Sequence, residues 1–221
     1  TGRDTAQAVA SDMDIRNGLG KFPLFSTSTR ETRYRHEDLP PETRAVAERL
    51  RNMQASHRQF LEVFAGFRDG SYATSFQDSV VPAGTDMSTR SWYRECAASP
   101  GGSALSAVYQ TIQNVPAVSL THRIKGPGGE MVGVVGVDIS LAGLRDIVRD
   151  FRLDTSGRFV IIEKDGRLIC SPKTPELEGR IIGRDFRHAI LEYIFAQPDG
   201  THDFHLDGVD GMATSIATDF G

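Results

Sequence analysis

Four residues stand out by type and spacing, because together their side chains could bind a small zwitterion. Arg90 is followed closely by Trp92 and Tyr93, and Asp138 comes at the end of a β-branched apolar run. A guanidinium group can hold a carboxylate through two hydrogen bonds, and an indole donates one N–H beside a large apolar face. A carboxylate accepts hydrogen bonds from an ammonium group. The set therefore predicts a binding site for a small polar molecule.

Each of these residues also has a structural interpretation. Arg90 could pair with a surface acid, and Trp92 and Tyr93 could be core aromatic residues at the start of a helix. Asp138 could cap a helix, which is a role compatible with ligand contact. Any one residue taken alone favours the structural interpretation, whereas the joint pattern favours ligand binding.

The element that must carry Asp138 is a buried strand. Residues 131–137 are β-branched and interrupted by glycines, a pattern typical of a buried strand whose glycines leave room for a neighbour or a ligand. Ser140 suits the N-cap of a following helix. One face of that helix is apolar, with Leu141, Leu144, Ile147, Val148 and Phe151. The strand thus delivers Asp138 to its end, and the helix leads into the second half of the chain.

Two Asp-Gly hairpins divide the chain into comparable halves. Apolar runs flank Asp69-Gly70 over residues 60–73 and Asp165-Gly166 over residues 159–170. Glycine accepts the positive φ of a tight turn that is compatible with strand twist, so the pattern predicts a hairpin at both places. A pair at domain-scale separation indicates a duplicated module.

After each hairpin we expect a short helix and a second strand pair. An antiparallel sheet with a helix on it is the economical fold for each half, so the predicted fold class is α+β. In the first half, the helix is expected at residues 92–98 and the strands at 115–124 and 131–139, with their turn at 126–129. In the second half, the helix is expected at residues 185–196 and the strands at 201–206 and 211–217, with their turn at 207–208.

The chain before the first hairpin is predicted to be partly helical and partly irregular. Residues 5–13 could be the end of a longer helix, which Gly18, Gly20 and Pro23 would interrupt, and residues 26–36 are polar and without pattern. Prolines 40 and 41 with Glu42 suit the start of a better helix. Its sheet-facing side is expected to carry Val46, Leu50, Met53 and His57.

Composition is that of a globular protein without a nucleic-acid partner. With 221 residues and 39% hydrophobic content, the chain can bury the cores of two small domains. The net charge is −4 and the basic residues are dispersed, whereas phosphate binding needs a basic face. No run approaches the roughly 18 apolar residues that span a bilayer. The start, at Thr1, has neither an initiator methionine nor a secretory apolar region, so we expect the chain to be trimmed from a longer one.

Other candidate chemistry is weak, and we expect no catalytic residue, no metal and no cofactor. His202 and His205 would face opposite sides of a strand, so a shared metal is not favoured. The glycines at 126–129 lack the lysine and the helix of a phosphate loop. Cys96 and Cys170 are interpreted as unpaired core residues, with a disulfide left open.

Several short motifs, in their order along the chain, carry a resemblance to a known family. Arg90-Ser91-Trp92-Tyr93, residues 132–141 ending in Val-Asp-Ile-Ser-Leu, Asp165-Gly166 and Cys170-Ser171-Pro172 resemble the double Cache family. These are extracytoplasmic sensor domains of bacterial chemoreceptors, histidine kinases and nucleotide cyclases. The resemblance covers about residues 60–217 and implies two PAS-like halves after a long N-terminal helix. It also implies a closing strand that is missing or cut short after Gly221.

The resemblance assigns the expected organisation of the chain. Residues 1–41 would form the N-terminal helical and irregular segment, and residues 42–140 the membrane-distal, ligand-binding half. Residues 141–151 would form the connecting helix, and residues 152–221 the membrane-proximal half.

In members that bind amino acids, a tyrosine precedes the Arg-x-Trp-Tyr motif by five residues, and a second tyrosine and an aspartate follow. Here a threonine replaces the first tyrosine, and the second is about one residue off the usual spacing. Because one wall of the expected site is changed, the ligand could be an amine, a carboxylate or a purine as well as an amino acid. The implied ligand-binding residues are Thr85, Asp86, Arg90, Trp92, Tyr93, Tyr109 and Asp138.

The predicted function is therefore that of a ligand-sensing domain and not of an enzyme. The resemblance implies the periplasmic portion of an inner-membrane receptor, anchored by transmembrane helices outside this chain, with a homodimer left open. Signalling of this kind needs only a difference in ligand affinity between two conformations. The alternative is a structural, dimerisation or protein-interaction module without a small-molecule ligand.

Overall fold

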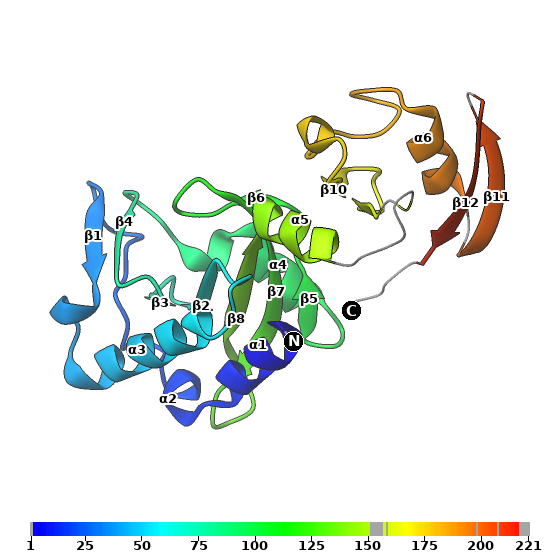
Figure 1. The fold of residues 1–221 in the computed structure, drawn as a ribbon. Helices are drawn as coiled ribbons and strands as arrows, with labels where there is room; N and C mark the ends of the chain where they lie inside the picture. Colours follow the sequence, from blue (N-terminus) through cyan, green and yellow to red (C-terminus); the bar gives the residue numbers. More distant parts are fainter. Residues whose placement is uncertain (1, 151–156, 158, 198, 207, 217–221) are drawn as a thin grey trace. The chain divides into compact units, whose positions relative to one another are not determined.

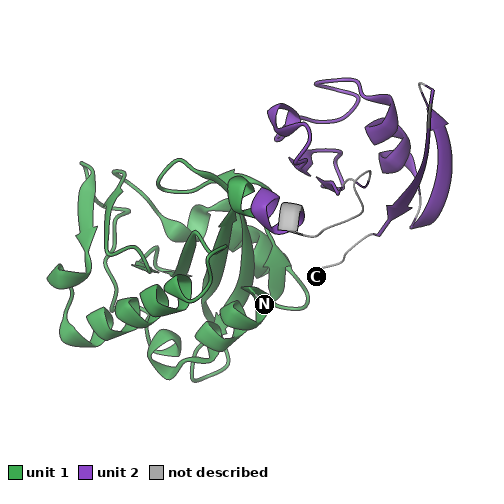
Figure 2. Ribbon diagram, viewed as in Figure 1, with its two compact units in different colours: residues 1–143, 220–221 green, residues 144–219 purple. Residues whose placement is uncertain are grey.

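The computed structural model describes residues 2–150, 157, 159–197, 199–206 and 208–216. These residues form two compact units, the first ending at Gly143 and the second beginning at Leu144 (Figure 2). Each unit is an α+β structure with antiparallel strands, so the predicted fold class is confirmed.

A six-stranded antiparallel sheet forms the centre of the first unit (Figure 1). The strand order is β3-β2-β8-β7-β5, and β6 also pairs with β7. β2 and β8 lie in the interior of the sheet, and every residue of β2 is buried. The strands are β2 (Glu62–Phe67), β3 (Tyr72–Thr74), β5 (Ser103–Leu105), β6 (Tyr109–Gln110), β7 (Pro116–Lys125) and β8 (Met131–Ser140).

Both predicted Asp-Gly turns are present. Gly70 has a φ of 88°, and its N–H donates to the carbonyl of Phe67 at 2.9 Å in the turn between β2 and β3. Gly166 has a φ of 86° and donates to Glu163 at 2.9 Å in the second unit. A side chain with a Cβ rarely adopts this conformation, which is why glycine marks both turns.

Three longer helices pack against this sheet. α1 (Gly2–Ser11) contacts β7 and β8, α3 (Pro41–Ala55) contacts β2 and β3, and α4 (Ser91–Ala98) contacts β7 and β8. α1 begins before the expected residue 5 and ends at Ser11, because the Asp12 carboxylate caps the N-terminus of the short helix α2 (Met13–Arg16). Short 3-10 turns are η1 (His36–Asp38) and η2 (Met87–Thr89).

One strand pair lies in a stretch where the sequence showed no pattern. β1 (Thr32–Arg35) pairs with β4 (Asp78–Val81) in a separate antiparallel ribbon. Residues 26–36, which are polar and without pattern, thus contain a strand that the sequence did not indicate. Its single buried residue is Tyr34, whose ring packs near those of Phe25 and Tyr72. Pairing with β4, the ion pair of Arg33 with Asp78 and the packing of Tyr34 together hold this polar strand in place.

β8 runs directly into a helix. The helix α5 spans Leu141–Asp150, and Ser140 Oγ accepts a hydrogen bond from the Gly143 N–H at 2.9 Å. The predicted N-cap role of Ser140 is thus confirmed. Phe151, which was expected on the apolar face of this helix, lies outside the described residues.

A glycine in β8 leaves room for a neighbouring side chain. A Cβ at Gly136 would lie 2.2 Å from Cζ of Phe64 on the adjacent strand. The Phe64 ring in turn meets Trp92 of α4 edge-on, with 4.7 Å between ring centroids. Gly136 therefore allows α4 to bring its tryptophan close to the sheet.

The second unit is smaller and has a small core of Leu168, Ile182 and Leu191. Its described strands form two ribbons, β9 with β10 and β11 with β12, in place of the single sheet that was expected. The helix expected from Asp185 begins later, because His188 caps it while the Asp185 carboxylate accepts from the Ile181 N–H at 2.9 Å. The elements are β9 (Ile161–Ile162), β10 (Leu168–Cys170), η3 (Pro175–Leu177), α6 (Ala189–Ala196), β11 (Gly200–Leu206) and β12 (Val209–Ser215).

Several expectations about reactive groups can be compared with the described residues. Cys96 and Cys170 are buried and free, as predicted. No group of three metal-ligating side chains occurs in the described part of the chain. Within the same residues, no helix has both the length and the apolar character needed to cross a membrane.

Candidate functional site

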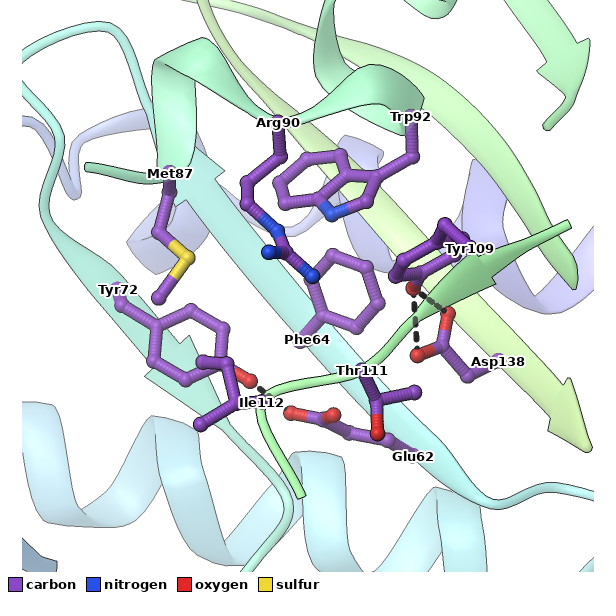
Figure 3. A pocket seen from close by; sticks show the side chains of 10 residues that line it. All are labelled: Glu62, Phe64, Tyr72, Met87, Arg90, Trp92, Tyr109, Thr111, Ile112 and Asp138. Atoms are coloured by element: carbon purple, nitrogen blue, oxygen red, sulfur yellow. Dashed lines mark hydrogen bonds between the residues drawn. The ribbon is translucent and has the colours of Figure 1, made fainter. Parts of the chain in front are cut away.

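A small cavity lies in the first unit between the sheet and the segment that leads into α4 (Figure 3). Its volume is about 10 Å³, which is close to the space that one water molecule needs. A larger ligand would therefore require lining side chains to move. Acidic, basic, aromatic and aliphatic side chains surround it: Glu62, Phe64, Tyr72, Met87, Arg90, Trp92, Tyr109, Thr111, Ile112 and Asp138.

Asp138 reaches the cavity from β8, two residues before this strand ends. Its side chain is almost fully buried, and both carboxylate oxygens accept from the Tyr109 hydroxyl at 2.6 Å. Burial raises the pKa of Asp138 well above its ordinary value, and the nearby negative charge of Glu62 raises this pKa further. The Tyr109 hydrogen bond lowers the pKa of Asp138 but does not offset the burial.

Glu62 enters the same cavity from the first position of β2, directly opposite Asp138. Its Oε1 atom accepts from the hydroxyls of Tyr72 and Thr74, the latter at 2.5 Å. Burial raises the pKa of Glu62 to about 7, although both hydroxyls and the charge of Arg90 act to lower it. This carboxyl group therefore titrates near neutral pH.

Arg90 lies between η2 and α4, at the N-cap position of α4. Its guanidinium group donates to the carbonyl of Gln110 and lies over the Tyr109 ring, 5.5 Å from the ring centroid. In Figure 3 this side chain extends into the region of the cavity between Trp92 and Tyr72. The half-buried cation thus faces two buried carboxyl groups within one cavity.

Four of the residues expected to bind a ligand line this cavity together. They come from different elements: Arg90 precedes α4, Trp92 is in α4, Tyr109 is in β6 and Asp138 is in β8. Distant parts of the sequence therefore converge on one place, although their role in binding remains a proposal.

Tyr93, in contrast, does not line the cavity. Consecutive residues of a helix point about 100° apart, so Tyr93 cannot share the direction of Trp92. Its ring packs edge-on against Trp92 with 5.8 Å between centroids, and burial raises the pKa of its hydroxyl to about 12. Its contacts in this structure are those of a core residue.

Thr85 and Asp86 also lie away from the cavity lining. Thr85 Oγ1 donates to the carbonyl of Pro82 at 2.7 Å. Asp86 caps η2, where its Oδ1 accepts from the N–H and the hydroxyl of Ser88 at 2.9 and 2.7 Å. Both side chains thus hold the loop before Arg90 in shape.

Sequence reasoning did not identify Glu62 or Tyr72 as cavity residues. The signal for Glu62 was a single acidic residue inside the apolar run 60–67. In a strand, residues two apart share a face, so Glu62 lies on the same face as Phe64. Other unpredicted lining residues are Phe64, Met87, Thr111 and Ile112.

The chemistry of the lining suits reversible binding. Buried carboxylates hold cationic groups, a guanidinium group holds a carboxylate, and aromatic rings provide walls that exclude water. Hydroxyls of Tyr72, Thr74 and Tyr109 are all committed to the two carboxyl groups. The lining therefore offers binding groups for a molecule that carries both signs of charge.

Comparison with known proteins identifies relatives in bacterial chemotaxis. The chain is 31% identical over 158 residues to the methyl-accepting chemotaxis protein McpA of Pseudomonas putida. That match covers 69% of this chain and 23% of McpA, so the chain spans about a quarter of this relative's length. No protein-family model matches the chain.

Solved structures show the same fold. The ligand-binding domain of the Pseudomonas fluorescens chemoreceptor CtaA, in complex with L-alanine, matches with a TM-score of 0.62 at 20% identity, over 95% of this chain and 77% of CtaA's. The ligand-binding domain of the Pseudomonas aeruginosa amino acid chemoreceptor PctC, in complex with GABA, matches with a TM-score of 0.58 at 18% identity. This match covers 96% of this chain and 80% of the PctC chain. The fold is thus that of chemoreceptor ligand-binding domains. The resemblance to double Cache sensor domains is confirmed.

Proposed function

We propose that this chain is the extracytoplasmic ligand-sensing part of a bacterial membrane receptor, and that it binds a small amino compound in the cavity of the first unit. The observation that carries the proposal is the convergence of Arg90, Asp138 and Glu62 on one aromatic-walled cavity. A carboxylate group of the ligand would bind Arg90, and an ammonium group would bind the buried carboxyl groups.

The relatives support the ligand class and the setting. The solved domains of CtaA and PctC are complexes with L-alanine and GABA, which each carry one ammonium and one carboxylate group. The proposal includes a periplasmic location, membrane attachment through helices outside this chain, and a chemoreceptor, kinase or cyclase output. Dimerisation of the whole receptor is compatible with it. No catalytic group is assigned, because binding that shifts a conformational equilibrium suffices for signalling.

A thermal-shift screen of amino acids, amines, carboxylates and purines tests the proposal. Binding to the folded state alone raises stability by about 2.7 kcal/mol at a hundred times the dissociation constant, so a ligand should raise the melting temperature clearly. Arg90→Ala and Asp138→Asn should each abolish that shift, because each removes a charge expected to hold the ligand.

Thr85→Ala is the matched control, because Thr85 lies near Arg90 in the sequence but outside the cavity lining. It should respond as the parent does. If no compound stabilises the parent, or if both cavity variants respond like the parent, the proposal is wrong. A dependence of melting on protein concentration without any ligand response would favour an interaction module.

A further inference from the structure

Glu62 and Asp138 form a buried pair of carboxyl groups. The register of β2 and β8 places them directly opposite each other, and both side chains are at most 2% exposed. Directly opposite residues of an antiparallel pair have Cβ atoms about 5 Å apart on the same face. The two carboxyl groups are therefore close neighbours in the cavity lining.

One oxygen of this pair has no protein donor. Both hydrogen bonds to Glu62 reach Oε1, and among the described residues no donor reaches Oε2. A carboxylate oxygen without a protein donor can accept hydrogen bonds from a group bound beside it. Since Glu62 lines the cavity, a bound group that donates hydrogen bonds would have this oxygen as an acceptor.

The charges around the pair do not balance. Arg90 is the cation among the lining residues, and it stands against two carboxyl groups. The other titratable groups near the pair are the hydroxyls of Tyr72, Tyr109 and Tyr34, which stay neutral because burial raises the pKa of each. His36 Nε2 donates to the carbonyl of Thr74 at 2.9 Å. With both carboxyl groups ionised, Arg90 and the pair sum to one net negative charge.

We propose that Glu62 determines ligand specificity: with Asp138 it forms a subsite that takes two ammonium groups, so the cavity prefers an amino acid of net charge +1 over a neutral one. In this arrangement Arg90 holds the ligand's carboxylate. The charge of the diamino acid then cancels the excess charge of the cavity. This inference rests on the proposed function and adds the class of amino acid to it.

A neutral amino acid brings no second ammonium group, so a proton held by the carboxyl pair cancels the excess negative charge of the cavity instead. Because the pKa values of both carboxyl groups are raised, that of Glu62 to about 7, the pair retains a proton near neutral pH. A second ammonium group favours the ionised form and displaces this proton to solvent. Affinity for a diamino acid should therefore rise with pH until the pair is fully ionised, whereas a neutral amino acid should bind without releasing the proton.

The test compares L-ornithine with L-norvaline, which has the same carbon chain without the second ammonium group. Isothermal titration calorimetry on the full chain at about pH 7, in two buffers of different ionisation enthalpy, counts the protons released. We expect release of up to about one proton with L-ornithine and none with L-norvaline. At about pH 8 the parent should bind L-ornithine about ten-fold more tightly or better, because a buried charge is otherwise unpaired.

Glu62→Gln keeps the size of the side chain and removes its charge. This variant should lose the preference for L-ornithine while it still binds L-norvaline. Glu37→Gln is the control for a lost acid, since the Glu37 side chain is 73% exposed and is not part of the cavity lining. It should retain the preference of the parent.

Equal affinities in the parent, no proton release with L-ornithine, or a preference that survives in Glu62→Gln would each overturn the inference. The proton count uses the parent alone, so it decides the matter even if the variant fails to fold. If L-ornithine does not bind, the inference is wrong. The proposed function fails with it only if the wider thermal-shift screen finds no stabilising compound.

Discussion

At the scale of single residues, the cavity is defined by how burial changes ionisable groups. Glu62 and Asp138 are acids near the ends of two interior strands, and burial raises the pKa of both. Three hydroxyls donate to them, which partly replaces the water that they lose. Their ionisation must therefore weaken the folded state.

This cost predicts a pH-dependent stability that Glu62→Gln should remove. Below the ordinary pKa of 4.5, Glu62 is protonated in both the folded and the unfolded chain. Between 4.5 and about 7 only the unfolded chain ionises, so the free energy of unfolding falls as pH rises. Above about 7 the full penalty applies. At pH 8 the variant should be more stable than the parent by roughly 3 kcal/mol, and near pH 4 the two should be equal.

Urea unfolding at several pH values between 4 and 8 measures this difference. Glu37→Gln, which changes an exposed acid, should follow the parent throughout. Parallel pH profiles of the parent and Glu62→Gln would show that Glu62 ionises freely in the folded state, contrary to its burial.

Two tyrosines offer a second prediction at this scale. Tyr109→Phe removes the donor to Asp138 and should weaken the ligand-induced thermal shift, because the carboxylate loses its orientation. Tyr93→Phe should leave the shift unchanged, because Tyr93 packs beside Trp92 and does not line the cavity. A melting screen with the stabilising compound compares the two variants. The reverse order of effects would contradict the assignment of these side chains.

At the scale of elements, β2 and β8 position the cavity through register and close packing. Their pairing sets Glu62 against Asp138 and Phe64 against Gly136. The missing side chain at Gly136 admits the Phe64 ring, on which Trp92 of α4 rests. One glycine thereby affects two walls of the cavity.

Gly136→Ala should destabilise the first unit by about 1–3 kcal/mol, because overpacking forces the neighbouring ring to move. The new Cβ would lie 2.2 Å from the Phe64 ring. Phe64→Leu combined with Gly136→Ala should cost less than the sum of the two single changes, since the smaller side chain frees space. Denaturant midpoints of the three variants measure this coupling. Strict additivity would contradict the packing argument.

At the scale of the whole molecule, the described cavity belongs entirely to the first unit. Every lining residue comes before Gly143, and this unit has its own sheet and core. The core of the second unit is far smaller, with Leu168, Ile182 and Leu191 at its centre. The second unit should therefore unfold first on heating.

A shortened chain of residues 1–150, which keeps α5 whole, should fold and give the same ligand-induced thermal shift as the full chain. The reason is that its sheet and cavity use no residue of the later elements. Circular dichroism and the melting screen check folding and binding. Loss of binding in a folded shortened chain would show that the second unit takes part in the site.

The sequence predicted those parts of the fold that depend on local chemistry. The Asp-Gly turns follow from the positive φ of Gly70 and Gly166, and the N-cap at Ser140 follows from its hydroxyl. β1 could not be predicted, because its strand depends on the packing of Tyr34 against residues distant in the sequence.

Lining residues that belong to a sequence motif could be predicted, whereas those placed by the pairing of distant strands could not. Arg90, Trp92 and Asp138 were identified by residue type and spacing. Glu62 lines the cavity because β2 pairs with β8, and no local sequence pattern indicates this pairing. Tyr93 was misplaced because spacing along the chain does not tell which of two neighbouring helix residues faces the cavity.

β8 runs into α5 without an intervening loop. Ser140 is the last residue of the strand and Leu141 is the first residue of the helix, which continues past Gly143 into the second unit. A loop would absorb a backbone movement by changing its own dihedral angles. Because no loop separates β8 from α5, a backbone movement at the end of β8 should also shift the first turn of α5.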